Sequence, residues 1–279
     1  MVSSVSGGDA SFTSRDGSGA VPGTRFVDVR WVAETGSTNA DLLALAADGA
    51  PEGTVLVADH QTAGRGRLGR VWTAPPEASI LLSVLLRPDL GLDHAHALTT
   101  AVALSAIEAC EAVTGVRAGL KWPNDLVIPV PWAGGAERKL AGVLAESTLS
   151  GHRFSAVVVG IGINVNWPDE LPAEIDDLAV ALNHLTGASV DRHGLVASLL
   201  TGLERRYAAL LAPGGRAAQR AEEQAASATL GREVRVLRSH DEIVGTVVGF
   251  EDDGALRLEV DTDVLTIPVG DVIHLRPGS

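Results

Sequence analysis

Two uninterrupted apolar runs restrict the possible folds of this chain more than any other feature of its sequence. They are ILLSVLL at 80–86 and AVVVGIGI at 156–163. Both are too short to span a bilayer, which takes about 20 apolar residues in a helix. Short apolar runs bounded by turn residues are typical of buried strands. The sequence therefore predicts a globular protein built on core strands, with no membrane association.

Periodic patterns around these runs predict both strands and helices. Strands are expected at 25–34, 54–62, 78–88, 139–149 and 154–166, together with a strand at 120–130 that is broken at Pro123. A short helix should follow ETGSTN, with Thr38 and Asp41 spaced as an N-terminal cap and Gly49 closing it. A long apolar helix is expected from residue 93 to about 116, and helical patterns from about 178 to 228. This mixture indicates an α+β fold.

The two ends of the chain differ from its centre. Segments REVRVLR, EIVGTVVGF, ALRLEV and VLTIPV alternate as short strands do, and turns such as Asp253-Gly254 join them. We therefore predict a separate small β-barrel at 230–279. Residues 1–24 are rich in Ser and Gly and lack the basic start and apolar centre of a secretion signal. They are predicted to be a disordered tail, which leaves 25–229 as the main domain.

Charge and cysteine content exclude some classes of function. A net charge of -13 argues against a protein that coats nucleic acid, because such binding depends on neutralising phosphates. The single cysteine, Cys110, lies in an apolar helical pattern and is expected to be an inert core thiol. No disulfide can form within the chain, so we expect a cytoplasmic location. Only two of the 22 cationic residues are lysine, Lys121 and Lys139, which suggests that both are kept for a specific task, with chance survival of two lysines as the alternative interpretation.

The densest positive charge lies in GRGRLGR at 64–70. The segment GRGRLG matches the G-x-G-x-x-G dinucleotide fingerprint, but an apolar strand follows it where that fingerprint requires a helix. Glycines let backbone amides approach a ligand, and guanidinium groups donate in pairs to phosphate or carboxylate. The loop is suited to enclosing an anion. A solvated basic turn is the alternative interpretation.

Three further motifs contain polar residues where a plain core would not. KWPNDL at 121–126 groups Lys, Asn and Asp at a proline, and RKLAG at 138–142 holds the second lysine. VVVGIGINVN ends a buried strand with two glycines and the amides of Asn164 and Asn166, for which a β-bulge is the alternative interpretation. All these motifs together favour one shared site.

In this order, ETGSTN, GRGRLGR followed by Val71-Trp72, KWPNDL, KLAG and GIGINVN resemble the signature motifs of biotin protein ligases, also called biotin–(acetyl-CoA-carboxylase) ligases. The resemblance covers about residue 25 to the C-terminus. It implies a catalytic domain with a mixed sheet and helices, related to class II aminoacyl-tRNA synthetases and lipoate ligases, followed by an SH3-like barrel. Some members carry an N-terminal helix-turn-helix domain, but only 33 residues precede ETGSTN. We therefore expect a short form without DNA-dependent control.

The resemblance also implies roles for individual residues. Those expected to contact biotin are Ser37, Thr38, Asn39, Gln61, Arg65, Gly66, Arg67 and Lys139. Those expected near ATP or the adenylate are Arg70, Trp72, Lys121, Asn124, Asp125 and Asn164, with Trp72 stacked on adenine. Arg65, Arg67 and Lys139 are the expected catalytic residues. Mg²⁺ is expected with ATP, without an assignment of its ligands.

The implied reaction has two steps. The biotin carboxylate attacks the α-phosphorus of ATP to give biotinyl-5′-AMP and pyrophosphate, and a lysine of a biotin carboxyl carrier domain then attacks the mixed anhydride. A lipoate or octanoate ligase would share the fold and the adenylate chemistry, but its arginine and glycine-run motifs are missing. A nucleic-acid-binding module could use the same basic loop, although no aromatic residues alternate with its arginines. The oligomeric state is left open.

Overall fold

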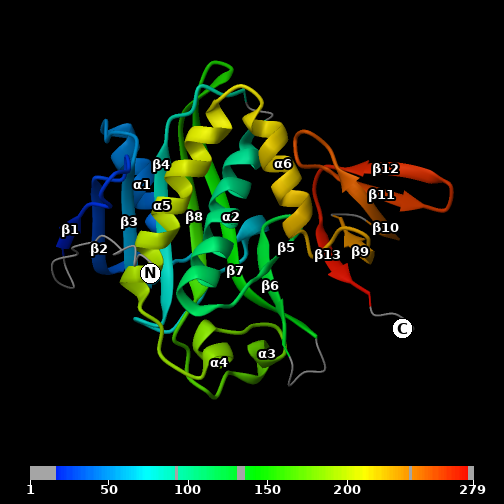
Figure 1. Cartoon of the computed structure of the whole chain (residues 1–279), viewed down its shortest axis with the longest axis horizontal. Coiled ribbons are helices and arrows are strands. Elements are labelled where there is room, and N and C mark those ends of the chain that lie inside the picture. Colours follow the sequence, from blue (N-terminus) through cyan, green and yellow to red (C-terminus); the bar gives the residue numbers. More distant parts are fainter. Residues whose placement is uncertain (1–16, 92–93, 131–135, 239–240, 276–279) are drawn as a thin grey trace, which may run out of the picture.

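The computed structural model describes residues 17–91, 94–130, 136–238 and 241–275 (Figure 1). Most of these residues belong to a domain built on an eight-stranded sheet in the order β1-β2-β3-β4-β8-β7-β6-β5. The pair β2–β3 is parallel and the remaining pairs are antiparallel. The strands are β1 (Gly17–Gly19), β2 (Asp28–Thr35), β3 (Thr54–Gln61), β4 (Ser79–Leu86), β5 (Gly119–Lys121), β6 (Asp125–Pro129), β7 (Glu137–Ser150) and β8 (Arg153–Asn164).

Helices cover both faces of this sheet. They are α1 (Thr38–Ala47), α2 (Ala95–Thr114), α3 (Ala173–Asp176), α4 (Leu182–Thr186), α5 (Arg192–Leu211) and α6 (Gly215–Ala226), with a 3-10 turn, η1 (Arg67–Gly69). The helices α2 and α5 pack together over one face (Figure 1), and α1 packs on the other. The predicted mixed sheet with helices is thus confirmed.

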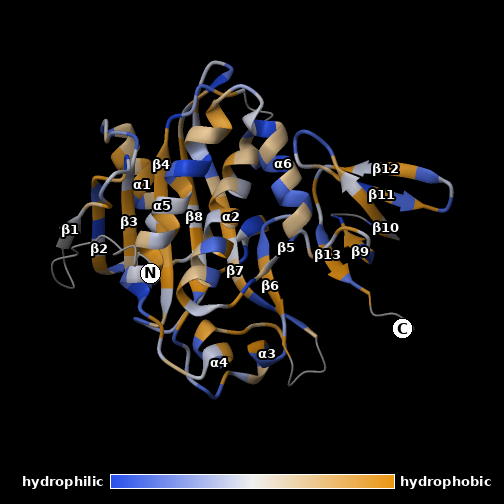
Figure 2. Ribbon diagram, in the orientation of Figure 1, coloured by the Kyte–Doolittle hydropathy of each residue, from blue (hydrophilic) through white to orange (hydrophobic). Residues whose placement is uncertain are grey.

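Alternation along the central strands explains this layering. On β4, Leu82 and Val84 join the core under α2 and α5, whereas Leu85 joins the smaller cluster under α1. Every residue of β4 is buried, and Figure 2 shows the strands of the large sheet mostly in the hydrophobic colour. An uninterrupted apolar run is therefore required, because both faces of the strand are covered.

The helix α2 is long and apolar enough to cross a membrane by length and composition alone. However, 61% of its apolar 18-residue stretch is buried inside the protein. Its place between the sheet and α5 makes it a core helix. It ends at Gly115, whose φ of 74° is the left-handed conformation that glycine adopts readily. Cys110 is buried in this helix, and burial raises the pKa of its thiol to about 12. A thiol in this state is a poor nucleophile.

Two local predictions were wrong. The N-cap of α1 is Ser37 and not Thr38, because the Thr38 hydroxyl donates to Gln61 Oε1 at 3.0 Å instead of capping the helix. Asp41 accepts a hydrogen bond from Thr35. The predicted tail at 1–24 is too long, since β1 pairs with β2 and Val21 is buried. Residues 1–16 of that tail lie outside the described residues.

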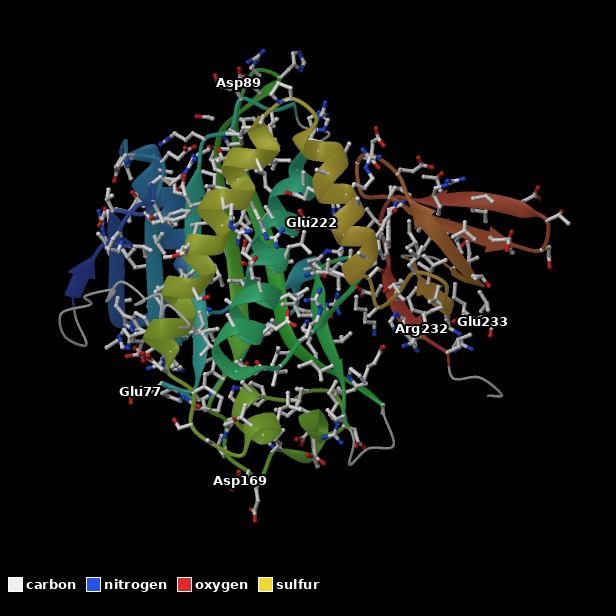
Figure 3. All side chains as sticks on the ribbon, in the orientation of Figure 1. Glu77, Asp89, Asp169, Glu222, Arg232 and Glu233 are labelled. Carbon is white, nitrogen blue, oxygen red and sulfur yellow. The ribbon has the colours of Figure 1, made fainter. Side chains whose placement is uncertain are left out.

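The C-terminal segment forms a second, five-stranded antiparallel sheet in the order β12-β11-β10-β9-β13. Its strands are β9 (Glu233–Leu237), β10 (Glu242–Phe250), β11 (Leu256–Val260), β12 (Asp263–Ile267) and β13 (Asp271–His274). The first four were predicted and β13 was not. Trp122 of the first domain lies in the apolar core of this sheet, and its indole N–H donates to Gly254 O at 2.9 Å. Near the same boundary, Arg232, which is labelled in Figure 3, pairs with Glu137 of β7 at 2.9 Å.

Candidate active site

A shallow hollow in the α1 face of the large sheet results from small residues in neighbouring strands. On β8, Val157, Val159 and Ile161 face the α2–α5 core, so Gly160 and Gly162 face the other way. In register, Gly160 lies between Ser83 of β4 and Leu144 of β7, and Gly162 lies opposite Gly142 of β7. The pairing shows no register shift at these glycines, so the β-bulge interpretation of this segment is wrong. The motifs KLAG and GIG therefore bring two glycines face to face.

The indole of Trp72 occupies the space above these glycines. A Cβ added to Gly162 would lie 2.5 Å from the Trp72 ring, and one added to Gly142 would lie 3.0 Å from it. Larger residues at either position would displace the ring. The indole N–H is buried and has no hydrogen-bond partner among the described residues. It is available to an acceptor on a bound molecule.

A buried polar cluster forms the other part of the floor. Gln61 Oε1 accepts from the backbone N–H of Thr38 at 2.7 Å and from its hydroxyl. The Ser83 hydroxyl lies 2.7 Å from Thr38 Oγ1 and 2.6 Å from Asn39 Oδ1. The Asn39 amide then donates to Leu144 O and to Glu146 at 2.8 Å. These bonds fix both amide side chains before any ligand arrives.

The arginine-rich segment forms a short hairpin over this floor. Trp72 N donates to Gly64 O at 3.0 Å, and Gly66 N donates to Arg70 O at 2.7 Å. Inside the hairpin, Leu68 has a φ of 55°, a left-handed conformation that is unusual for a branched side chain. Its side chain is 68% exposed. The loop is thus closed on itself by backbone bonds, and its apolar tip points into solvent.

The arginines of the loop contact carboxylates from distant parts of the chain. Arg65 pairs with Glu146 of β7 at 3.0 Å, and Arg70 pairs with Asp271 of β13 at 2.7 Å. Arg67 lies 3.9 Å from Asp271, and its Nη1 is buried with no hydrogen bond to the part of the chain that the structure describes. Burial lowers the pKa of the Arg67 guanidinium, and Asp271 acts against this shift. A site with a desolvated cation is prepared for an anion.

The second lysine lies on the opposite wall. Lys139 Nζ is 2.7 Å from Asp125 Oδ1 and 5.2 Å from the centroid of the Trp72 ring. Next to it, the Asn124 side chain donates to Val143 O at 2.7 Å. Asp125 and Lys139 are brought together by the β6–β7 pairing. The ammonium group therefore faces the aromatic ring and the arginine loop across one cavity.

This cavity has a volume of about 140 Å³. Most residues that were predicted from separate motifs line it, and these are Ser37, Thr38, Asn39, Gln61, Arg65, Gly66, Arg67, Arg70, Trp72, Asn124, Asp125 and Lys139. They come from segments that lie up to about one hundred residues apart in the sequence. The arrangement brings together cations, an aromatic ring and fixed amides, a combination suited to a molecule with an anionic end and a polar ring system.

Two predicted residues do not line the cavity. Asn164 is buried at the end of β8, where its amide donates to Lys139 O at 3.2 Å and to Val180 O at 3.1 Å. Lys121 lies on β5 close enough to Glu137 to lower the pKa of that carboxyl. Among the described residues, no group of three or more His, Cys, Asp or Glu side chains could hold a metal ion.

Sequence reasoning missed three contributors to the site. Ser83 interrupts the apolar run ILLSVLL, and this interruption was a usable signal. Glu146 follows Gly142 and Leu144 at spacings of two, so strand periodicity could have placed it on the same face. Asp271 gave no local signal, because only the docking of the second sheet brings it to the loop.

Comparison with known proteins gives matches in both domains. Residues 32–164 match the profile described as the Biotin/lipoate A/B protein ligase family, and residues 229–275 match the biotin protein ligase C-terminal domain. A biotin–(acetyl-CoA-carboxylase) ligase of Mycobacterium tuberculosis is 41% identical over 264 residues, covering 92% of each chain. The bifunctional ligase/repressor BirA of Bacillus spizizenii is 35% identical over 82% of this chain and 68% of its own length.

A similar fold is found among solved structures. A biotin protein ligase from Aquifex aeolicus in complex with biotin and ATP superimposes with a TM-score of 0.73 at 32% identity. The match covers 89% of this chain and 98% of that one. The similarity extends across both sheets, because the matched region spans nearly the whole chain.

Proposed function

This chain belongs to the biotin/lipoate A/B protein ligase family, and from that premise we propose how its cavity performs the reaction. The protein is an ATP-dependent biotin ligase. The observation that carries the proposal is the convergence of the arginine loop, Lys139 and the fixed amides on one cavity.

The polar floor holds the ring system of biotin. Because Gln61, Thr38 and Ser83 are already bonded to one another, the floor offers its remaining donors and acceptors in fixed positions. Ser37 and Asn39 complete this side of the cavity. A preformed hydrogen-bonding surface favours a rigid polar ring over a flexible apolar chain, because fewer groups must be ordered on binding.

Adenylation joins two anions. The carboxylate oxygen of biotin forms a bond to the α-phosphorus of ATP, and the bond from that phosphorus to the bridging oxygen breaks, releasing pyrophosphate. Lys139, Arg65 and Arg67 reduce the repulsion between the carboxylate and the phosphates and stabilise the charge on the leaving group. For this, Lys139 exchanges its present partner, Asp125, for the incoming anion.

The nucleotide lies on the opposite side, against Trp72, Arg70, Asn124 and Asp125. Trp72 lines the cavity, so its ring offers a surface for stacking, and its indole N–H, which has no partner among the described residues, offers one hydrogen bond. Mg²⁺ commonly binds through one or two carboxylates and the phosphates of its substrate, and Asp125 is a carboxylate in this cavity that fits such a site. When bound, the ion would neutralise phosphate charge.

Lys121 and Asn164 take indirect roles in this proposal. Asn164 fixes the backbone at Lys139 and thereby the direction of its side chain. Lys121 supports the interface with the second sheet through its charge near Glu137.

In the second step, the amine of an acceptor lysine attacks the acyl carbon of biotinyl-5′-AMP, an amide forms, and AMP leaves with loss of a proton. The acceptors are biotin carboxyl carrier domains of carboxylases. We place this reaction in the cytoplasm, in keeping with the single buried cysteine. We assign the catalytic domain to 17–229, which adds β1 to the predicted range of 25–229, and the SH3-like domain to 230–279.

ATP–pyrophosphate exchange tests this function directly. The purified protein is incubated with Mg²⁺-ATP and labelled pyrophosphate, with biotin, with lipoate or without an acid. Exchange that depends on biotin is the expected result. Exchange with lipoate alone would identify a lipoate ligase, and the absence of exchange with every acid would reject the adenylation proposal. Salt-sensitive DNA affinity in that case would favour the nucleic-acid-binding alternative.

A further inference from the structure

The arginine loop at 64–72 is attached to the second sheet by an ion pair that crosses the boundary between the domains. The donor is Arg70 and the acceptor is Asp271 Oδ1, at 2.7 Å and 201 residues apart in sequence. Asp271 is not among the residues that line the active-site cavity. Asp271 is therefore linked to the cavity through the loop arginines that it contacts.

The Arg70 guanidinium links Asp271 to the middle of the loop. Its Nε donates to Arg67 O at 3.2 Å, while Nη2 donates to Asp271. Arg67 itself lies 3.9 Å from the same carboxylate, with its guanidinium mostly buried between the active-site cavity and a second cavity at the domain boundary. One carboxylate thus attracts two loop arginines, and it fixes the backbone of one through the side chain of the other.

Asp271 has a firm support. It lies on β13, and three residues further along this strand His274 bonds to Glu137 of the catalytic domain. Trp122 is 6% exposed in the core of the C-terminal sheet, and its backbone N–H donates to Thr229 Oγ1 at 3.1 Å. Because the contacts of His274 and Trp122 hold the two domains together, the position of Asp271 is set independently of the loop.

The loop contributes little to its own attachment. Its tip residue Leu68 is mostly exposed, and its internal bonds close the hairpin without joining it to the floor. The side-chain ion pairs to other elements are those of Arg65 with Glu146 and of Arg70 and Arg67 with Asp271. At the end of the loop Trp72 packs on the floor, so the arginine tip at 65–70 is the part that can open when either ion pair is lost.

We propose that Asp271 is a positioning residue which, through Arg70 and Arg67, keeps the arginine loop closed over the cavity and so retains the reactive adenylate until the acceptor arrives. The proposal rests on the adenylation function given above. It also gives the C-terminal domain a task in the reaction, as the fixed support of a mobile part of the active site.

The test uses the full-length protein with Asp271→Asn, which removes the charge and preserves the shape of the side chain. Preformed biotinyl-5′-AMP on the protein is chased with unlabelled biotin and ATP, and its release rate is measured. Removal of a partly exposed ion pair should speed release by about two- to fivefold. Asp263→Asn, at the tip of the β11–β12 hairpin and away from the large sheet (Figure 1), is the matched control with the same change in charge and the wild-type rate.

Two further variants separate positioning from general destabilisation. Asp271→Glu should restore slow release, because a carboxylate remains. Arg70→Gln should also speed release, in part because Arg70 borders the nucleotide, and the effect of the double variant should be smaller than the sum of the two single effects, since both changes remove the Arg70–Asp271 contact. Additive effects, or a release rate in Asp271→Asn equal to that of the wild type, would overturn the proposal.

A second measurement does not depend on catalysis. Trypsin can cut after Arg65, Arg67 and Arg70, and the fragments are identified by mass. Cleavage in the unliganded Asp271→Asn protein should be faster than in Asp263→Asn. If biotin-dependent exchange were absent from the wild type, the proposed function would fail, while this assay would still report whether Asp271 holds the loop closed. Equal cleavage of the two variants would reject the role of Asp271 alone.

Discussion

The floor of the cavity and the loop above it are built in opposite ways. The floor is made of buried strand and helix residues, such as Ser83 and Asn39, whose hydrogen bonds are satisfied within the protein. The loop is exposed, carries Leu68 in a left-handed conformation, and is held by ion pairs to Glu146 and Asp271. A rigid floor can select a ligand by shape, whereas a weakly held loop can open for it and close again. Selectivity and retention are thus assigned to different parts of one site.

Lys139→Ala should have the largest effect, because it removes a cation from the wall of the cavity that lies between the floor and the loop. We expect biotin-dependent ATP–pyrophosphate exchange to fall about 100- to 1000-fold, the range for loss of one group that stabilises developing charge. The side chain is 35% exposed, so the fold should persist. An unchanged melting temperature with unchanged exchange at saturating ATP would remove Lys139 from the mechanism.

Gly160→Ala tests the rigidity of the floor. The new methyl group would lie 2.2 Å from Asn39 Oδ1 and 3.2 Å from Ser83 Oγ, so the fixed amide must move. Overpacking of this kind costs about 1–3 kcal/mol, and biotin affinity measured by calorimetry should weaken by tenfold or more. Gly249→Ala on β10 is the control, since its nearest neighbour would be 3.8 Å away. Wild-type affinity in Gly160→Ala would mean that the floor is as adaptable as the loop.

Ser83→Ala asks how much the polar cluster contributes by itself. Loss of the hydroxyl leaves Asn39 Oδ1 buried without its partner, which costs about 1–3 kcal/mol. Both the free energy of unfolding and the affinity for biotin should decrease. Ser105→Ala is the control, because that buried hydroxyl donates only to Ala101 O of its own helix. If both variants lost the same amount of unfolding free energy and of biotin affinity, the hydrogen-bonded cluster of the floor would have no particular role in binding.

Glu137→Gln should have the smallest effect and tests the support of the loop. Burial alone would raise the pKa of Glu137, but a hydrogen bond to His274 and the charges of His274, Arg232 and Lys121 lower it overall. A lowered pKa in the folded state stabilises the protein above the unfolded pKa, and this stability is lost as the pH falls through the folded pKa.

As the pH is lowered below about 5, the melting temperature of the wild type should therefore fall further than that of Glu137→Gln. We expect the two decreases to differ by about 2–4 °C. Glu233→Gln, an exposed neighbour that is labelled in Figure 3, serves as the control. Identical pH profiles for Glu137→Gln and the wild type would show that this pair does not hold the domains together.

The segments that form the floor were easier to predict from sequence than the contacts of the loop. Segments around the floor were predicted well, because burial on one or both faces leaves a regular pattern: β4, β8 and α2 lie close to their expected ranges. The cap of α1 was misplaced by one residue because Thr38 serves the site and not the helix end. The alternative of a bulge at Gly160 and Gly162 failed for a related reason, since the missing side chains make room for Trp72.

By itself, the sequence determined the two domains, the core strands, and most of the residues that meet in the cavity, because strand periodicity and short motifs are local properties of the chain. The tertiary structure alone decided that Trp122 packs in the core of the second sheet, that Asn164 lies behind Lys139, and that Asp271 reaches the arginine loop. These contacts join residues that are distant in sequence. Those of Trp122 and Asp271 depend on how the two sheets meet, and that of Asn164 depends on the contact between β8 and β7. No local pattern encodes them, because each depends on where a second, distant segment lies.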